Sequence, residues 1–195
     1  MSFFSSELGD GICEIRWHGR GGQGAITSAR YLARAAYLAG FRGITSAPSF
    51  GAERRGAPVT ASTRLSPEPI RVFSQVESPD AVIVLDETLL GCANATSGLK
   101  DDGWLIVNSP REPGELGVDG PFSVATANAT ALAQQVKLVV AGSVMVNTAM
   151  LGALSRATEL VDLENIRASL AQGLKPSAAK LNFEAARLTY EQTKL

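Results

Sequence analysis

Residues 13–34 read CEIRWHGRGGQGAITSARYLAR, and this stretch decides the predicted fold. The short, mostly apolar run at 13–17 predicts a strand. Four glycines follow within six residues, and apolar residues then recur at helical spacing to about Leu38. Strand, glycine loop and helix in this order are typical of an anion-binding turn. Glycines let backbone N–H groups approach a phosphate, and the start of a helix leaves N–H groups unpaired.

The remaining pattern predicts a single α/β domain over 1–195, with a Rossmann-like, mostly parallel sheet flanked by helices. A strand at 41–48 would form a parallel βαβ unit with the first strand. An antiparallel insertion is expected over 59–73, where an alternating run, a proline turn and a short apolar run follow one another. The apolar run 139–142 is expected to pack in the core. Further strands are predicted at 81–85, 104–107 and 122–125, and helices at 129–136, 144–154, 163–170 and 177–192.

Composition and charge place the chain among ordinary globular proteins. Of its 195 residues, 45% are hydrophobic and 19% are charged, and the formal net charge is -1, which gives no general attraction to nucleic acid. No run approaches the roughly 18 apolar residues that a membrane span needs, and nothing before the first strand has the form of a signal peptide. We therefore expect a cytoplasmic protein without membrane or nucleic-acid contacts.

The sequence gives little indication of a metal-binding site. The two cysteines, Cys13 and Cys92, are too far apart to match the ligand spacing of a zinc or iron–sulfur site. No cluster of carboxylates suggests a magnesium site. Cys13 begins a predicted buried strand, which favours a packing role over reactivity. We expect no metal ligands in this chain.

The most unusual segment is PSFGAERRGAP at 48–58. Two prolines and two glycines frame one carboxylate and two guanidinium groups, which predicts a rigid loop at the carboxyl end of the second strand, where ligands of parallel sheets bind. Arg54 or Arg55 would meet a diphosphate or carboxylate, and Glu53 would orient one of them or pair with a partner protein. The alternative is a set of exposed ion pairs with little energetic effect.

Two familiar kinds of active site are not favoured. A dinucleotide fold would place an acidic residue about twenty positions after the glycine loop, where this chain has Ile44, Thr45 and Ser46. The only histidine, His18, directly precedes the loop and is suited either to a structural hydrogen bond or to contact with a cofactor or partner. Asp86 follows a predicted buried strand, where helix capping is favoured over ligand contact. We assign no catalytic residue.

Three segments together carry a resemblance to a known family. HGRGGQGAITSARYLA at 18–33, SFGAERRGAPVTAS at 49–62 and PDAVIVLDETLL at 79–90 resemble the gamma subunit of 2-oxoacid:acceptor oxidoreductases, the family of pyruvate:ferredoxin oxidoreductase. Later segments, GLKDDGWLIVNS at 98–109 and VNTAMLGAL at 146–154, are similar to the family as well. The resemblance therefore covers most of the chain.

The resemblance implies a subunit that is not catalytic alone. In the family, a 2-oxoacid is oxidatively decarboxylated to an acyl-CoA by thiamine diphosphate and magnesium in other subunits, and electrons leave through [4Fe-4S] clusters. The implied partners are alpha, beta and ferredoxin-like delta subunits, with a flavin or NAD subunit in some assemblies. This chain would complete the active-site and coenzyme A region. The candidate cofactor-binding residues are Gly19, Arg20, Gly21, Gly22, Gln23, Gly24, Ser49, Phe50, Glu53, Arg54 and Arg55.

Three classes of function remain open. The chain is a subunit of such a complex, a free-standing nucleotide-binding oxidoreductase, or a purely structural interface subunit whose glycine loop only permits close packing. The first reading predicts that the loop at 19–24 lies close to Arg54 or Arg55 at one sheet edge, facing a partner chain.

Overall fold

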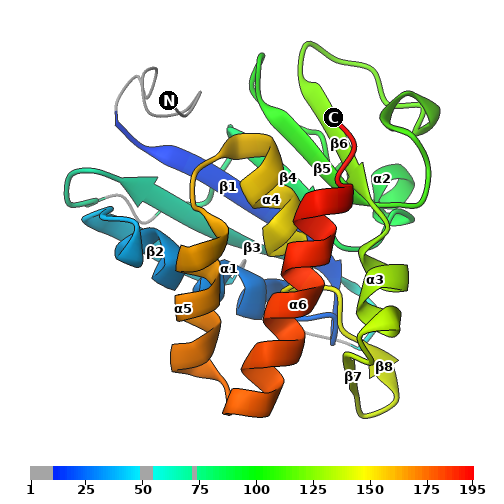
Figure 1. The fold of residues 1–195 in the computed structure, drawn as a ribbon. Helices are drawn as coiled ribbons and strands as arrows, with labels where there is room; N and C mark the ends of the chain where they lie inside the picture. The colour runs from blue at the N-terminus through cyan, green and yellow to red at the C-terminus, as the bar shows by residue number, and fades with distance from the viewer. Residues whose placement is uncertain (1–10, 49–54, 72–73) are drawn as a thin grey trace.

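A six-stranded sheet forms the centre of the molecule, with strand order β2-β3-β1-β4-β5-β6 (Figure 1). The structure is a computed structural model and describes residues 11–48, 55–71 and 74–195. The parallel half contains β1, β4, β5 and β6, whereas β3 runs antiparallel to both of its neighbours. The strands are β1 (Cys13–Arg20), β2 (Gly43–Pro48), β3 (Pro58–Ser66), β4 (Ala81–Val84), β5 (Trp104–Asn108) and β6 (Ser123–Ala127).

The expected α/β class and mostly parallel sheet are confirmed, and so is an antiparallel strand within the insertion. The predicted βαβ unit is wrong in one respect, because β3 lies between β1 and β2. These two strands run in the same direction but share no hydrogen-bonded ladder. The antiparallel β3 pairs with β1 along its whole length, from Cys13–Leu65 to Arg20–Pro58, and so takes the position next to β1. Ile70 and Arg71 are not in a strand, and 72–73 lie outside the described residues.

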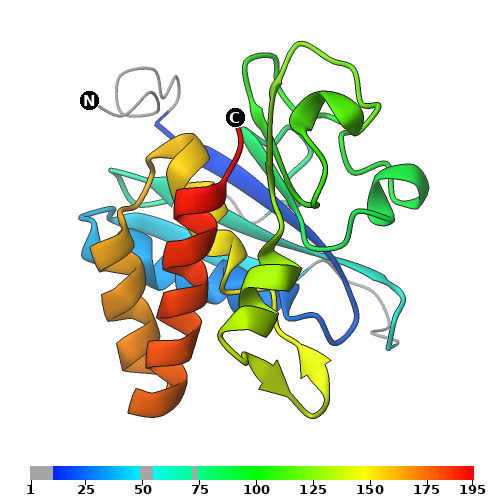
Figure 2. The same ribbon diagram turned by 45° about the vertical axis from the view of Figure 1, so that its right-hand side comes forward.

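Four helices cover one face of the sheet in two layers, two of them directly on the strands and two packed on the first two (Figures 1 and 2). Alternate side chains of β1, among them Ile15 and Trp17, point into this core and are fully buried. The four helices are α1 (Ala25–Leu38), α4 (Met150–Thr158), α5 (Leu163–Gly173) and α6 (Pro176–Gln192). The other helical segments are α2 (Leu89–Cys92), α3 (Ala129–Gln135) and the 3-10 helix η1 (Pro113–Glu115).

The region 139–149 differs from the prediction. It begins with a short hairpin of β7 (Val139–Val140) and β8 (Ser143–Val144), and helix α4 starts only at Met150. Ala141 and Gly142 both have positive φ, 49° and 79°, which is the backbone that a tight hairpin turn requires. The two valines of β7 are therefore not in the core, with 49% and 58% of their surface exposed. Figure 2 shows the hairpin extending from the body beside α3.

The opposite face of the sheet is covered over only part of its width. Over β4 and β5, a second apolar cluster that includes Val84, Leu89 and Val107 excludes water. Over β1 and β3 the same face carries polar side chains, because the residues that alternate with the core positions are Arg16 and His18 in β1 and Ser62 and Arg64 in β3, among others. None of the helices in the described part of the chain is long and apolar enough to cross a bilayer.

Candidate functional site: the glycine loop at the carboxyl edge of the sheet

The glycine loop lies directly against the loop that contains Arg55. Gly21 and Arg55 form a parallel bridge, in which the Gly21 N–H donates to the carbonyl oxygen of Ala57 at 2.8 Å and the Gly56 N–H donates to the carbonyl oxygen of Gly21 at 3.0 Å. The expected proximity of the loop to Arg54 or Arg55 is thus confirmed for Arg55. The other four candidates of this segment, Ser49, Phe50, Glu53 and Arg54, lie outside the described residues.

Arg20 is partly exposed and is held in place by three side-chain hydrogen bonds. Its Nε donates to Asp86 Oδ2 at 2.9 Å, its Nη2 donates to Thr88 Oγ1 at 2.6 Å and its Nη1 donates to the Gly56 carbonyl oxygen at 3.1 Å. All three guanidinium nitrogens therefore have partners, and the charge is paired with that of Asp86. Arg20 joins the glycine loop to the turn after β4 and to the Arg55 loop. It fixes the shape of the site.

Gln23 and Asp86 complete this network. The Gln23 Oε1 accepts from the Arg20 backbone N–H at 2.7 Å, and its Nε2 donates to Asp86 Oδ2 at 3.2 Å. Asp86 Oδ1 also accepts from the Thr88 N–H at 3.1 Å, but Thr88 is the N-cap of α2 and no side chain caps that helix, so the expected helix cap by Asp86 is not formed. Burial by itself would raise the pKa of Asp86, yet the hydrogen bonds from Thr88, Arg20 and Gln23 together lower it below its ordinary value. Sequence spacing gave no sign of the Arg20–Asp86 pair.

The start of helix α1 presents open backbone donors. Gly24 is its N-cap, with φ 85°, and no side chain caps the helix. Such an end leaves N–H groups and a partial positive charge that favour an anion. Asn147 closes the other side of the turn, since a Cβ atom on Gly24 would lie 2.8 Å from its Nδ2 atom, and its carbonyl oxygen accepts from Ser28 Oγ at 3.0 Å. Sequence reasoning did not single out Asn147, although it lies in one of the later family segments.

A pocket of about 310 Å³ opens beside the loop, at the carboxyl ends of β4 and β5. Its polar wall includes Gln23, Asp86, Glu87, Asn108 and Thr130. The chain after β1 leads to β2 on one side of the sheet, and the chain after β4 leads to β5 on the other side. The carboxyl ends of β1 and β4 therefore form a switch point of the topology, where ligands of open α/β sheets bind. Two carboxylates line the pocket, and they disfavour a phosphate within it. An anion is better placed at the N–H groups of α1.

The remaining candidate groups have structural surroundings. Cys13 is fully buried, and burial raises the pKa of its thiol, so its packing role is confirmed. His18 is 4% exposed and its Nε2 accepts from Arg16 Nε at 3.1 Å, the structural hydrogen bond that was one of the two expectations. In the described ranges, no three His, Cys, Asp or Glu side chains are grouped so that they could hold a metal ion.

The fold and the loop define the class of protein: a Rossmann-like α/β domain with an antiparallel strand beside β1 and a glycine loop tied to a neighbouring arginine loop. The sequence model of the pyruvate ferredoxin/flavodoxin oxidoreductase family matches residues 14–192, and the chain belongs to that family.

Relatives place the chain with the gamma subunits of the family, as the motifs had indicated. It is 43% identical over 187 residues to the common gamma subunit of the pyruvate/ketoisovalerate oxidoreductases of Pyrococcus furiosus, covering 94% of this chain and 98% of the relative. It is also 43% identical over 181 residues to the pyruvate synthase subunit PorC of Methanothermobacter thermautotrophicus, covering 93% and 96%.

Solved structures agree with this placement. The pyruvate oxidoreductase subunit PORC of Thermotoga maritima superposes with a TM-score of 0.80 at 36% identity, covering 94% of this chain and 97% of that one. A 2-oxoglutarate:ferredoxin oxidoreductase of Magnetococcus marinus contains the same fold, with a TM-score of 0.71 at 20% identity, over 31% of its own chain. In that larger protein the fold is one part of a longer polypeptide.

Proposed function

We propose that this chain is the gamma subunit of a multi-subunit 2-oxoacid:acceptor oxidoreductase, which oxidatively decarboxylates a 2-oxoacid to an acyl-CoA. In this proposal, the glycine loop and Arg55 form part of the coenzyme A region and of the subunit interface. The observation that carries the proposal is the bridge between Gly21 and Arg55, which joins an exposed guanidinium to the uncapped start of helix α1. Backbone N–H groups and a guanidinium are the donors that a diphosphate requires.

The division of charge within the site supports this assignment. Arg20 is neutralised by Asp86, whereas the Arg55 side chain makes no ion pair with any residue in the described part of the chain. Gly22, with φ 95° and open space where a Cβ atom would be, leaves the backbone accessible. Arg55, together with Arg54, would therefore supply the positive charge, and Arg20 would hold the loop in a shape that admits the diphosphate.

The proposal gives the oxidation chemistry to other subunits. The expected thiamine diphosphate and magnesium, bound elsewhere, would supply the decarboxylation, and [4Fe-4S] clusters would carry the electrons. The two cysteines of this chain are a buried Cys13 and an exposed Cys92, which do not fit a cluster. The Magnetococcus marinus relative was solved with 2-oxoglutarate, coenzyme A and succinyl-CoA bound. The expected partners of this chain are alpha, beta and delta subunits, with a flavin or NAD subunit as a further candidate.

Calorimetric titration of the assembled complex with coenzyme A tests the proposal. Arg55→Ala should weaken binding by about 10-fold or more, because a charge-assisted hydrogen bond to phosphate is lost. Arg42→Ala is the matched control. It removes an exposed arginine just before β2, at the amino end of the strands, and should leave the affinity unchanged.

Unchanged affinity in Arg55→Ala, with the complex intact, would contradict the coenzyme A assignment and leave the loop a packing role at the interface. Loss of the complex itself in Arg55→Ala, detected by size-exclusion chromatography, would assign Arg55 to subunit contact. Arg20→Ala is unsuitable for this purpose because it would release Asp86 and the loop together.

A further inference from the structure

The hairpin of β7 and β8 exposes apolar side chains on both of its faces. Val139 and Val140 have 49% and 58% of their surface exposed. Consecutive strand residues point to opposite sides, so neither face of the hairpin is fully covered by the body of the molecule. Figures 1 and 2 both show the hairpin at one end of the molecule, next to α3. The two valines therefore belong to a projecting arm and not to the edge of the core.

The hairpin lacks the features that normally protect an exposed strand. Native proteins place charged side chains or proline on open strand edges, which prevents pairing with other chains. Residues 138–144, LVVAGSV, contain neither a charged residue nor a proline. A two-stranded hairpin is also marginally stable in water without further packing. An uncharged apolar surface of this kind is typical of the centre of a protein interface.

The turn at the tip of the hairpin is apolar as well. Ala141 and Gly142 form it with φ of 49° and 79°, a geometry in which Asn or Gly is preferred at the first position. An alanine in this left-handed conformation costs about 1–2 kcal/mol. An Asn side chain would avoid much of that cost in water, but it would lose its bonds to water if a partner covered the tip. Alanine at this position therefore favours a covered tip.

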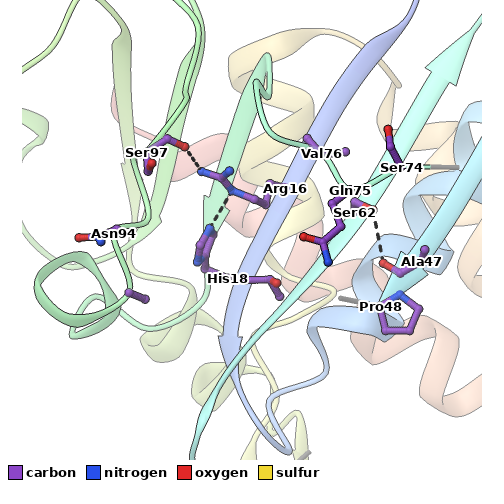
Figure 3. A pocket seen from close by; sticks show the side chains of 12 residues that line it. Arg16, His18, Ala47, Pro48, Ser62, Ser74, Gln75, Val76, Asn94 and Ser97 are labelled. Carbon is purple, nitrogen blue, oxygen red and sulfur yellow. Dashed lines mark hydrogen bonds between the residues drawn. The ribbon is translucent and has the colours of Figure 1, made fainter. Parts of the chain in front are cut away.

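The open polar face of the sheet gives the contrast. Over β1 and β3, Arg16 donates to His18 and to the carbonyl oxygen of Ser97, and Ser62 donates to the carbonyl oxygen of Ala47 (Figure 3). Polar side chains of this kind bond to water as well as to one another, so an open polar surface is compatible with solvent. The valines of the hairpin can only lose by contact with water.

The base of the hairpin is part of the wall beside the glycine loop. Val144 and Val146 line the pocket at the carboxyl ends of β4 and β5. The next residue, Asn147, donates from Nδ2 to the carbonyl oxygen of Gly24 at the start of α1, at 3.5 Å. The hairpin is thus continuous with the region that the proposed function assigns to the subunit interface. A chain that covers the hairpin lies beside that region.

The small exposed area decides between two kinds of partner. Two half-exposed valines present far less surface than the roughly 800 Å² per partner that a stable interface buries. In a symmetric dimer a second copy of this chain would make the same small contact, which could not hold the dimer together. The hairpin is suited to be one part of a larger interface with a different chain.

We propose that the β7–β8 hairpin is a docking arm that inserts into an apolar cleft of a different subunit, the subunit of the oxidoreductase complex that also faces the glycine loop. The identity of this partner rests on the proposed function, whereas the burial of the arm by another chain does not. The cleft is uncharged, because a charge placed against Val139 and Val140 would lose its hydration without gaining a partner.

Hydrogen exchange followed by mass spectrometry can observe the docking arm directly. Peptides that cover 136–147 should exchange rapidly in the isolated full chain. In the assembled complex the same peptides should exchange at least about 10-fold more slowly, because the amides of the hairpin are then shielded and its opening is opposed by the partner. The isolated chain is measured at several concentrations, so that association between copies is detected.

A double variant tests the apolar character of the contact. Val139→Thr with Val140→Thr keeps the side-chain shape and the strand preference, but it places two hydroxyl groups in the apolar cleft. The dissociation constant of this chain from the complex, measured by sedimentation of the diluted complex, should rise about 10-fold or more. Thermal unfolding of the isolated variant confirms that it is folded.

Tyr37→Ser is the control for this double variant. It removes a side chain that is 63% exposed, at the end of α1 opposite to the glycine loop. The dissociation constant should then stay within about 3-fold of the wild-type value. Equal weakening by the control and by the double variant would contradict a specific role of the hairpin.

Three exchange results would overturn the proposal. Hairpin peptides that exchange equally fast in the assembled complex would show that no subunit covers the arm. Protection in the isolated chain at every concentration would mean that a segment of the same chain covers it, and protection that grows with concentration would mean that a second copy does. These results leave the coenzyme A titration of Arg55→Ala unaffected, so the docking arm and the proposed coenzyme A region can fail separately.

Discussion

His18 illustrates how a single residue acquires its properties from its neighbours. The sequence places it before the glycine loop, but strand alternation turns its side chain to the polar sheet face, and Arg16, two residues earlier on the same face, binds its Nε2 atom. For Asp86 the surroundings favour the charged form, whereas for His18 they favour the neutral form. Several hydrogen-bond donors converge on the Asp86 carboxylate and lower its pKa. The pKa of both side chains is therefore lowered by their surroundings. For His18 the causes are burial and the charge of Arg16, and for Asp86 the effect of burial is outweighed by the hydrogen bonds from Thr88, Arg20 and Gln23.

The free energy of unfolding should depend on the ionisation of His18. Its pKa is 6.5 in the unfolded chain and about 4 in the folded protein, so between these values the unfolded state binds more protons. Stability from this group is complete above pH 6.5 and is lost as the pH falls toward 4, by about 3 kcal/mol in total. Urea unfolding of wild type and His18→Asn from pH 4 to pH 8 should show this difference. Parallel pH profiles for the two proteins would refute the lowered pKa.

At the scale of the element, the start of helix α1 depends on backbone conformation more than on side chains. Gly24 has a left-handed φ at the N-cap and packs against Asn147, while Gly22 has a left-handed φ in open space. The two positions therefore separate conformational strain from steric contact. No side-chain cap compensates at this end of the helix, so its geometry is set by the turn itself.

Replacing either glycine by alanine should lower the free energy of unfolding, but by different amounts. Gly22→Ala introduces only an unfavourable φ, which costs about 1–2 kcal/mol. Gly24→Ala adds a Cβ atom 2.8 Å from Asn147 Nδ2, and since Asn147 is buried and cannot move away freely, it should cost about 1–3 kcal/mol more. Chemical denaturation of both variants measures the difference. Equal losses would show that Asn147 moves aside and does not define the turn.

At the scale of the whole molecule, the strands of the sheet differ in how much of their surface is covered by packed side chains. All four residues of β4 are buried, with the helical layer on one side and the second apolar cluster on the other. β2 lies at the sheet edge, pairs only with β3, and has exposed residues at its end. Both faces of β4 are thus protected, whereas the polar half of the sheet that contains β2 is open on one face.

Hydrogen exchange should reproduce this asymmetry. Amides of Val82, Ile83 and Val84 should exchange only through global unfolding, and the paired amides of β2 should exchange through local opening at a lower free energy. Native-state exchange measured by NMR at increasing denaturant tests this order. If β2 exchanged as slowly as β4, the open face would have to be covered, for instance by association of two chains.

Sequence alone determined the class of fold, the order of most elements and the family. Those features depend on signals that lie within short stretches of the sequence: apolar runs such as 81–85, the glycine loop, and two rare motifs in a fixed order. Helix α6 and the strand β5 fall close to their predicted ranges for the same reason.

Only the tertiary structure decided which residues meet. The insertion of β3 beside β1, the Arg20–Asp86 pair and the contact of Asn147 with Gly24 join positions far apart in the chain, and their spacing carries no periodic signal. The His18 Nδ1 atom, buried and without a hydrogen-bond partner among the described residues, likewise depends on the packing around it. Local propensity sets what each segment forms, but long-range pairing chooses its neighbours, and the chemistry of the site depends on those neighbours.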